Sequence, residues 1–173
     1  CVNMQQAEQI RPSEFDQNTV LDWLPWNHTM GGNHSFNGIF WNGGTMYIDG
    51  GKPVPSLFQT TVDNLKDVSP TYYGSVPAGL AMLLENLKLD VDLRKAFFKN
   101  LIYIAYGGAS LPPEVWYGIR DLAKETTGKD IELMCGWGAT ETAPLATSTY
   151  FKLDKPGNIG LPVPGMEIKM VPV

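Results

Sequence analysis

A short glycine-rich stretch at residues 136–141, with the sequence GWGATE, carries the residue types best suited to chemistry. Trp137 lies between two glycines and can offer a flat face to a planar base. The hydroxyl of Thr140 can bond a phosphate oxygen, and the carboxylate of Glu141 suits a hard cation such as Mg²⁺. The same residues also suit a plain turn between a strand and a helix, with Thr140 as the helix cap. The stretch alone leaves both interpretations open.

A second glycine turn lies upstream and also follows an apolar run. Residues 101–105 (LIYIA) predict a strand, residues 107–108 a glycine turn, and residues 113–127 a helix that takes proline in its first turn. Residues 131–135 predict the next strand, which leads into the first glycine-rich stretch. If the two strands are parallel neighbours, both turns emerge at the carboxyl edge of the sheet, where open α/β folds bind ligands. A shared pocket at that edge is therefore expected.

Four motifs, in a fixed order, resemble those of the adenylate-forming enzymes, the superfamily of acyl-CoA synthetases, adenylation domains and firefly luciferase. Residues 107–109 (GGA) resemble the adenine loop, and residues 137–141 (WGATE) resemble the aromatic-Gly-x-Thr-Glu motif. Residues 24–32 (LPWNHTMGG) resemble the Leu-Pro-x-x-His-x-x-Gly segment, and residues 160–167 (GLPVPGME) the Gly-x-Pro-x-Pro-Gly stretch. Residues 23–53 are most similar to feruloyl-CoA synthetases and related aryl-CoA ligases.

The resemblance implies a ligase that needs ATP, Mg²⁺ and coenzyme A. A carboxylate attacks the α-phosphate of ATP, pyrophosphate leaves, and the thiol of coenzyme A then opens the acyl-adenylate to a thioester. No general base is needed in the first step, because the nucleophile is already an anion. The partners are thus ATP, coenzyme A and a small carboxylic acid.

The resemblance also implies a role for individual residues. The implied catalytic residues are His28, Thr140 and Glu141, with Glu141 as the Mg²⁺ ligand. The implied nucleotide-binding residues are Gly107, Gly108, Ala109, Gly136, Trp137, Gly138 and Thr140. The implied acid-binding residues are His28, Met30, His34 and Gly136. Many members of the family have Tyr where this chain has Trp137, a change that keeps stacking but loses a phenol hydrogen bond. Gly31 and Gly32 would allow a close approach of the backbone to the acid.

Other parts of the family's enzymes are expected outside this sequence. Their Ser/Thr/Gly-rich phosphate loop with its Lys precedes the His28 motif, and residues 1–20 contain nothing similar. The ribose-binding Asp, the hinge and the small C-terminal domain with its catalytic Lys are expected after Val173. We therefore expect residues 1–173 to be a single partial domain, the middle of the AMP-binding N-terminal domain, and to be inactive as a ligase by themselves.

Composition and charge argue against several classes of function. The 173 residues are 43% hydrophobic and 18% charged, as is ordinary for a globular domain. The net charge of -5 disfavours a nucleic-acid-binding surface, and no apolar run is long enough for a membrane span. Two cysteines, Cys1 and Cys135, are too few for a disulfide framework, and no signal peptide is evident. These features predict a cytoplasmic protein.

Other catalytic motifs fail on spacing. Lys52 is followed by proline rather than by the Ser or Thr of a phosphate-binding P-loop. His28 and His34 are six positions apart, which does not match a helical pair of zinc ligands. Ser110 is not at the centre of a Gly-x-Ser-x-Gly elbow, so a serine hydrolase is disfavoured.

Apolar runs that alternate with amphipathic segments predict an α/β fold. The expected strands cover residues 20–26, 45–48, 71–75, 101–105 and 131–135, and the expected helices cover residues 56–68, 77–89 and 113–127. Gly128 suits the end of the last helix. Such alternation implies a mainly parallel sheet flanked by helices, as in the large N-terminal domain of adenylate-forming enzymes. The tail, residues 159–173, predicts a strand that leaves this sheet.

Two other functions stay open at this point. An adenylation domain that loads an amino or aryl acid onto a carrier protein shares the same motifs. The apolar and aromatic residues directly before His28 favour an aryl or acyl acid over an amino acid. A non-catalytic α/β nucleotide-binding domain would share the glycine turns but would not need Glu141.

Overall fold

The computed structural model of the chain describes residues 2–10 and 18–172. Its sheet has seven strands: β1 (Thr19–Asp22), β2 (Thr45–Ile48), β3 (Tyr72–Ser75), β4 (Tyr103–Tyr106), β5 (Glu132–Trp137), β6 (Thr147–Ser148) and β7 (Leu161–Pro162). Its α-helices are α1 (Val2–Ile10), α2 (Asn37–Trp41), α3 (Phe58–Asp67), α4 (Pro77–Leu89), α5 (Val91–Lys99) and α6 (Pro113–Thr127), and a π-helical segment, η1 (Met30–Phe36), precedes α2. Among these described residues, no helix is long and apolar enough to cross a membrane.

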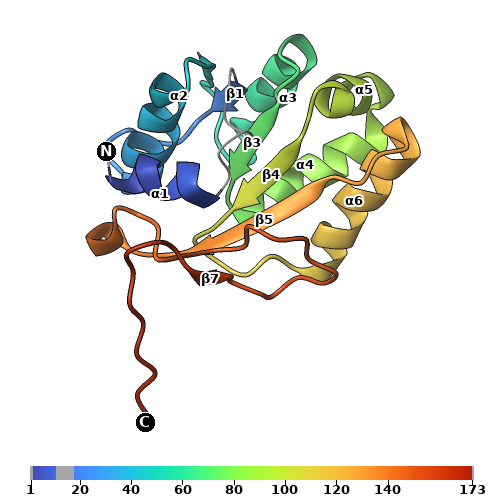
Figure 1. The fold of residues 1–173 in the computed structure, drawn as a ribbon. Coiled ribbons are helices and arrows are strands. Elements are labelled where there is room, and N and C mark those ends of the chain that lie inside the picture. Colours follow the sequence, from blue (N-terminus) through green and yellow to red (C-terminus); the bar gives the residue numbers. More distant parts are fainter. Residues whose placement is uncertain (1, 11–17, 173) are drawn as a thin grey trace.

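The sheet is mainly parallel. Its strands follow the order β2-β1-β3-β4-β5-β6-β7, in which β1 to β5 pair in parallel and β6 and β7 are antiparallel. Helices connect the parallel strands, as Figure 1 shows. This architecture confirms the predicted fold class. Tyr106 at the end of β4 is paired with Cys135 on β5, so the two glycine turns leave neighbouring strands at the same edge.

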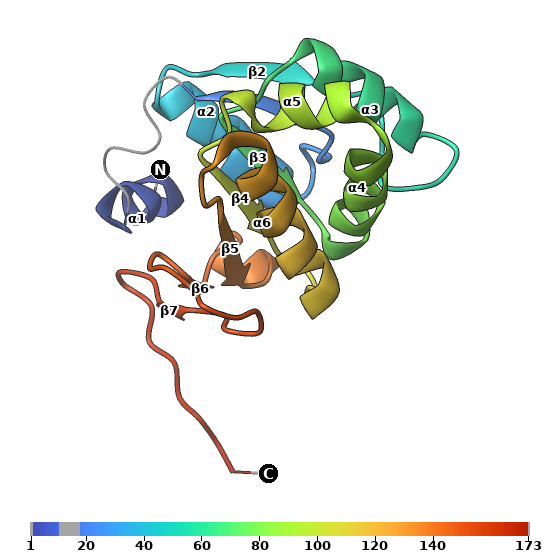
Figure 2. The same ribbon diagram turned by 90° about the vertical axis from the view of Figure 1, so that its right-hand side faces the viewer.

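Helices cover the two faces of the sheet differently (Figures 1 and 2). On one face, α3, α4, α5 and α6 pack together over the main hydrophobic core, which includes Tyr73 and Ile104. On the other face lie α1, η1 and α2, over a smaller core that includes Tyr72 and Tyr103. Adjacent residues of a strand point to opposite faces, which explains this division. We call the second one the open face, because it leaves room for a pocket.

Helix α5 lies where the sequence pattern predicts no element. The side chain of Asp90 caps it by accepting the N–H groups of Asp92 and Leu93, at 3.0 and 2.9 Å. Leu93 and Phe97, one turn apart, are fully buried in the main core. Phe98 is buried as well, and nine residues with three buried positions form too short a pattern for sequence periodicity to detect.

The first strand and the tail are both shorter than predicted. β1 ends at Asp22, whose Oδ1 accepts the N–H of Leu24 at 2.9 Å and turns the chain away from the sheet. In the tail, only β7 pairs with the sheet, and residues 163–172 form no strand. Val163 is still buried against the body, and residues 167–172 extend away from it, as Figures 1 and 2 show. Ile168 and Met170, whose alternation suggested a strand, are exposed. The prediction of a longer strand there is wrong.

Candidate functional site

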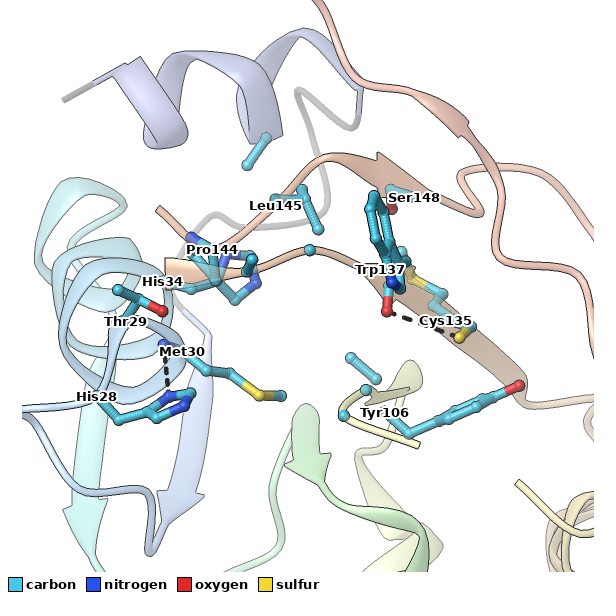
Figure 3. Close-up of a pocket in the computed structure, with 18 of the residues that line it drawn as sticks. His28, Thr29, Met30, His34, Tyr106, Cys135, Trp137, Pro144, Leu145 and Ser148 are labelled. Atoms are coloured by element: carbon cyan, nitrogen blue, oxygen red, sulfur yellow. Dashed lines mark hydrogen bonds between the residues drawn. The ribbon is translucent and has the colours of Figure 1, made fainter. Parts of the chain in front are cut away.

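A pocket of about 460 Å³ lies on the open face, at the carboxyl edge of the sheet (Figure 3). It brings together nearly all the predicted site residues: His28, Met30, His34, Gly107, Gly108, Gly136, Trp137, Gly138, Thr140 and Glu141. Ala109 is the exception, because it is exposed and does not line the pocket. Sequence analysis missed the remaining lining residues: Ala7, Ile10, Thr29, Tyr72, Tyr103, Ala105, Tyr106, Met134, Cys135, Ala139, Pro144, Leu145 and Ser148.

The two glycine turns lie close together where they leave β4 and β5. A Cβ placed on Gly107 would lie 3.4 Å from the carbonyl oxygen of Gly136. Gly108 has φ of 85°, a left-handed conformation that side chains other than glycine rarely adopt. A Cβ on Gly136 would meet the Cδ1 atom of Leu145 at 2.9 Å. Because no side chain separates the turns, one ligand can contact both.

The loop after β5 is closed by Thr142 rather than by Thr140. The Thr142 hydroxyl accepts the N–H of Ala139 at 2.8 Å and donates to the carbonyl of Pro144 at 2.7 Å. Gly138 lies against this bridge, where a Cβ would overlap the Pro144 carbonyl oxygen. Thr140 only begins a single 3₁₀ turn, whose N-cap is Ala139. The interpretation of Thr140 as a helix cap is therefore wrong.

Thr140 and Glu141 present their side chains to the pocket without internal partners. Both are exposed, and within the described ranges neither side chain makes a hydrogen bond or an ion pair. Trp137 beside them is 54% exposed, and Figure 3 shows its indole at the pocket. These groups can therefore meet a ligand without breaking a protein contact.

The donor set fits Mg²⁺ only if phosphates complete the coordination shell. The described residues contain no group of three or more His, Cys, Asp or Glu side chains that could hold a metal ion by themselves. Mg²⁺ commonly takes one or two protein carboxylates and fills its other positions with phosphate oxygens and water. Glu141 supplies one such carboxylate, at the end of the glycine-rich stretch that lines the pocket.

His28 is held in position by the turn in which it lies. Its N–H donates to the carbonyl of Pro25 at 3.0 Å, and its carbonyl accepts the N–H of Gly32 at 2.8 Å. Its ring Nδ1 accepts the N–H of Met30 at 3.1 Å, the contact dashed in Figure 3. Because Nδ1 is an acceptor, the neutral ring carries its proton on Nε2. His28 can therefore donate a hydrogen bond from Nε2 to a ligand in the pocket.

Gly31 and Gly32 pack against the chain that precedes them. A Cβ on Gly31 would overlap the carbonyl oxygen of Pro25, and one on Gly32 would overlap that of Trp26. Neither glycine is among the residues that line the pocket. Their close backbone approach thus serves the turn that holds His28, and the expectation that they face the acid is wrong.

Replacing Gly32 with Ala is expected to destabilise the protein by roughly 1–3 kcal/mol, the usual cost of overpacking against a fixed group. The added methyl cannot fit unless the turn that holds His28 moves. Gly38→Ala is the matched control, because its Cβ would meet only the flexible side chain of Met4, with Sδ at 3.4 Å, and Ala favours helix α2. Urea unfolding of both variants measures the difference. Equal stabilities would show that Gly32 has no packing role.

Met30 and His34 form one wall of the pocket on η1. Figure 3 shows the Met30 side chain directed into the space between His28 and the glycine turns. His34 is half-buried, and burial lowers its pKa below the ordinary value of 6.5. A neutral imidazole beside a thioether makes this wall uncharged near pH 7. It suits the body of an organic acid better than a phosphate.

The floor of the pocket comes from alternate residues of β3, β4 and β5. Tyr72, Tyr103, Ala105 and Met134 all lie on the open face. The rings of Tyr72 and Tyr103 stack, with centroids 4.8 Å apart and planes at 29°. Because side chains alternate along a strand, the predicted strands already place these four residues on one face of the sheet. The sequence does not tell which face the helices leave open, so these four residues could not be identified as site residues from it.

Asp22, on the strand next to β3, is buried, and its carboxyl has a raised pKa. Burial is the main cause, and hydrogen bonds from Leu24 and Ser35 offset part of it. The folded state therefore holds this proton more tightly than the unfolded chain does. Ionisation of Asp22 consequently opposes folding as the pH rises above the ordinary aspartate pKa of 3.8.

Replacing Asp22 with Asn is expected to raise the free energy of unfolding at pH 7. The amide keeps an oxygen that can accept the N–H of Leu24 and removes the buried charge. The advantage should shrink as the pH falls toward the ordinary aspartate pKa, where both proteins are neutral at this position. Denaturant unfolding at both pH values measures it. An Asn variant that is less stable than the wild type at pH 7 would contradict the argument.

The sequence as a whole matches one known family. The profile of the family described as "AMP-binding enzyme" matches residues 1–172. The chain belongs to the AMP-binding enzyme family. This assignment confirms the family predicted from the four motifs. No curated protein matches the chain in sequence.

Solved structures of CoA ligases share the fold of this AMP-binding chain. MenE from E. coli, with a bound phenylether-linked analogue of OSB-AMS, is 25% identical with a TM-score of 0.66, over 98% of this chain and 32% of that one. A malonyl-CoA ligase with bound methylmalonyl-CoA and AMP is 22% identical with a TM-score of 0.73, over 99% and 35%. The anthranilate CoA ligase AuaEII, in complex with anthranoyl-AMP, is 21% identical with a TM-score of 0.70, over 98% and 31%. The chain thus spans about a third of the length of these ligases.

Proposed function

We propose that the chain is the acid- and nucleotide-binding part of an ATP-dependent carboxylate–CoA ligase, which activates an aryl or acyl acid as acyl-AMP and transfers it to coenzyme A. One observation carries this proposal: a single pocket collects both glycine turns together with His28, Thr140 and Glu141. The ligands named for the similar structures support it, since they are an OSB-AMS analogue, anthranoyl-AMP, and AMP together with an acyl-CoA.

Adenylation needs no general base, because the attacking carboxylate is already an anion. It needs groups that neutralise charge and align the reactants at phosphorus, and the pocket offers such groups. The hydroxyl of Thr140, which has no partner in the described part of the chain, would bond the α-phosphate or the acid's carboxylate. Glu141 would hold Mg²⁺, which when bound neutralises phosphate charge. The exposed indole of Trp137 would stack on the adenine beside Gly107 and Gly108.

His28 would orient the acid for reaction. Its Nδ1 is already used by the N–H of Met30, so the ring offers only the Nε2–H donor to the pocket. A donor of this kind suits a carboxylate or the carbonyl oxygen of an acyl-adenylate. Both the N–H and the carbonyl of His28 are already hydrogen-bonded in the turn, so the residue loses little conformational freedom when a ligand binds.

The lining favours an aryl or acyl acid over an amino acid. Among the described residues that line the pocket, Glu141 is the only acidic one, so no second carboxylate is left to pair with an ammonium group. The floor is aromatic and apolar, with Tyr72, Tyr103 and Met134. An aromatic acid of the feruloyl type agrees with this lining and with the resemblance of residues 23–53 to feruloyl-CoA synthetases.

Calorimetric titration of the 173-residue chain with adenylate mimics tests the proposal. The ligands are AMP, a cinnamoyl sulfamoyl-adenosine that imitates acyl-AMP, and the guanosine counterpart of that mimic. We expect the adenosine mimic to bind about tenfold or more tightly than AMP, because it fills the nucleotide and acyl regions together. Failure of both adenosine ligands to bind, or equal affinity for the guanosine compound, would overturn the proposal.

A further inference from the structure

Thr149 holds the strand that leads into the glycine-rich stretch. It directly follows β6, is fully buried and does not line the pocket. Its hydroxyl accepts the N–H of Cys135 at 2.8 Å and donates to the carbonyl of Cys135 at 3.1 Å. Its own N–H donates to the same carbonyl at 2.9 Å. Thr149 thus binds both backbone polar groups of the residue directly before Gly136.

The hydroxyl of Thr149 takes the place of a backbone group of the sheet. A hydrogen-bonded antiparallel pair exchanges two backbone bonds, one in each direction. Between Thr149 and Cys135, the N–H of Thr149 makes one of these bonds, and the Thr149 side chain supplies the acceptor for the other. Without that side-chain oxygen, the buried N–H of Cys135 would lose its acceptor, which costs free energy.

The hairpin that carries the loop is short, so each contact that fixes it matters. β5 and β6 pair at two positions, Gly136 with Ser148 and Trp137 with Thr147. The loop of residues 138–145, which contains Thr140 and Glu141, begins directly after them. A register slip of one residue would displace this loop and turn the side chains of β6 to the opposite face. The contact between Thr149 and Cys135 opposes such a slip at the end of the hairpin away from the loop.

The hydroxyl of Thr147, two positions earlier and also buried, bonds in a different direction. It donates to the carbonyl of Ile159 at 2.6 Å, in the segment before β7. A Cβ on Gly160, the next residue, would overlap the backbone of Ser148, so the tail lies tightly against β6. The side chain of Thr147 therefore holds the tail to β6, whereas that of Thr149 holds β6 to β5.

We propose that Thr149 is a positioning residue for nucleotide binding, which acts through Cys135 to set where Trp137, Thr140 and Glu141 stand in the pocket. The inference rests on the proposed function and adds to it a residue outside the pocket. In the described part of the chain, the side chains of Thr140 and Glu141 have no partners, so the backbone of the loop alone places them. A displacement of about 1 Å that originates far from the reacting groups can lower a rate by a factor on the order of 10².

Three variants of the 173-residue chain test the inference, by calorimetric titration with the cinnamoyl sulfamoyl-adenosine at a temperature where each variant is folded. Thr149→Val keeps the shape of the side chain and removes its hydroxyl, and the affinity should fall by about tenfold or more. Thr149→Ser keeps the hydroxyl and should bind like the wild type. Thr147→Val is the matched control, because it removes a buried hydroxyl that bonds to the tail. It should lose stability in urea but keep the wild-type affinity.

Amide hydrogen exchange, followed by NMR, provides a second measurement that depends neither on the ligand nor on how Thr149→Val folds. The N–H of Cys135 should exchange slowly in the wild type and in Thr149→Ser, because the hydroxyl protects it. Rapid exchange of this N–H in the wild type would overturn the inference.

The binding results separate this inference from the proposed function. Wild-type affinity in Thr149→Val, the same loss of affinity in Thr147→Val, or weak binding by Thr149→Ser would overturn the positioning role. In each of these cases, a wild type that binds the mimic more tightly than AMP leaves the proposed ligase function standing. If the wild type binds neither AMP nor the mimic, both proposals fail.

Discussion

Replacing Glu141 with Gln is expected to lower the rate of acyl-adenylate formation by a factor on the order of 10² or more, in a ligase of full family length that contains these residues. Glu141 lines the pocket, and in the described part of the chain its carboxylate has no partner, so it contributes little to folding. The amide of Gln is nearly isosteric but is a poor Mg²⁺ ligand. ATP–pyrophosphate exchange measures the rate, and thermal melting measures the fold.

Glu114→Gln is the matched control for this experiment. Glu114 is an exposed carboxylate after the other glycine turn, in the first turn of α6, and it does not line the pocket. It should keep the wild-type exchange rate, and both variants should melt close to the wild type, as surface substitutions usually do. Near-normal exchange in Glu141→Gln would leave Glu141 as a mere turn residue. A collapsed melting temperature would make its role structural.

The position of the two glycine turns was predictable, because each comes directly after an apolar strand. Parallel neighbouring strands end at one edge of a sheet, so the chemistry at their carboxyl ends must converge. The pairing of Tyr106 with Cys135 confirms this, and a Cβ placed on Gly107 would lie only 3.4 Å from the carbonyl oxygen of Gly136. The site could thus be located from local signals and one rule of topology.

Helices α4 and α6 begin and end at the predicted residues. Pro77 and Pro113 stand in the first turn of their helices, where proline is favoured. Gly128 ends α6 with φ of 73°, the left-handed conformation typical of a helix C-terminus. These boundaries are encoded in single residues with strong conformational preferences, so no tertiary information is needed to place them.

The parts that sequence analysis missed depend on contacts between distant residues. Gly31 and Gly32 suggested a ligand approaching the backbone, but the group that requires them is the preceding turn at Pro25 and Trp26. The role of Tyr72 in the pocket depends on where η1 and the β5 loop lie over the sheet. A glycine needed for packing and one needed for a ligand look alike in sequence, since both only mark the absence of a side chain.

Replacing Gly138 with Ala is expected to abolish adenylate binding through the backbone of the loop rather than through a lost ligand contact. The new Cβ would overlap the carbonyl oxygen of Pro144, which also accepts the Thr142 hydroxyl at 2.7 Å. To admit the methyl, the loop must move away from that bridge, and Thr140 and Glu141 must move with it. We expect a loss of roughly 1–3 kcal/mol in stability from overpacking. Affinity for the cinnamoyl sulfamoyl-adenosine should fall by more than about tenfold, as the polar groups lose their alignment.

A substitution that adds the same methyl elsewhere separates this local effect from general destabilisation. Gly50→Ala is suitable, because Gly50 is exposed, has no positive φ, and its Cβ would only contact the methyl of Thr60 at 3.9 Å. Urea unfolding and mimic binding for Gly50→Ala should both resemble the wild type. If Gly138→Ala loses stability but keeps the wild-type affinity, the loop adapts to the methyl without moving Thr140 and Glu141. That result would contradict the prediction that the packing of the loop controls binding. Loss of affinity at a temperature where the variant is still folded would instead establish that Gly138 positions the two polar residues for the nucleotide.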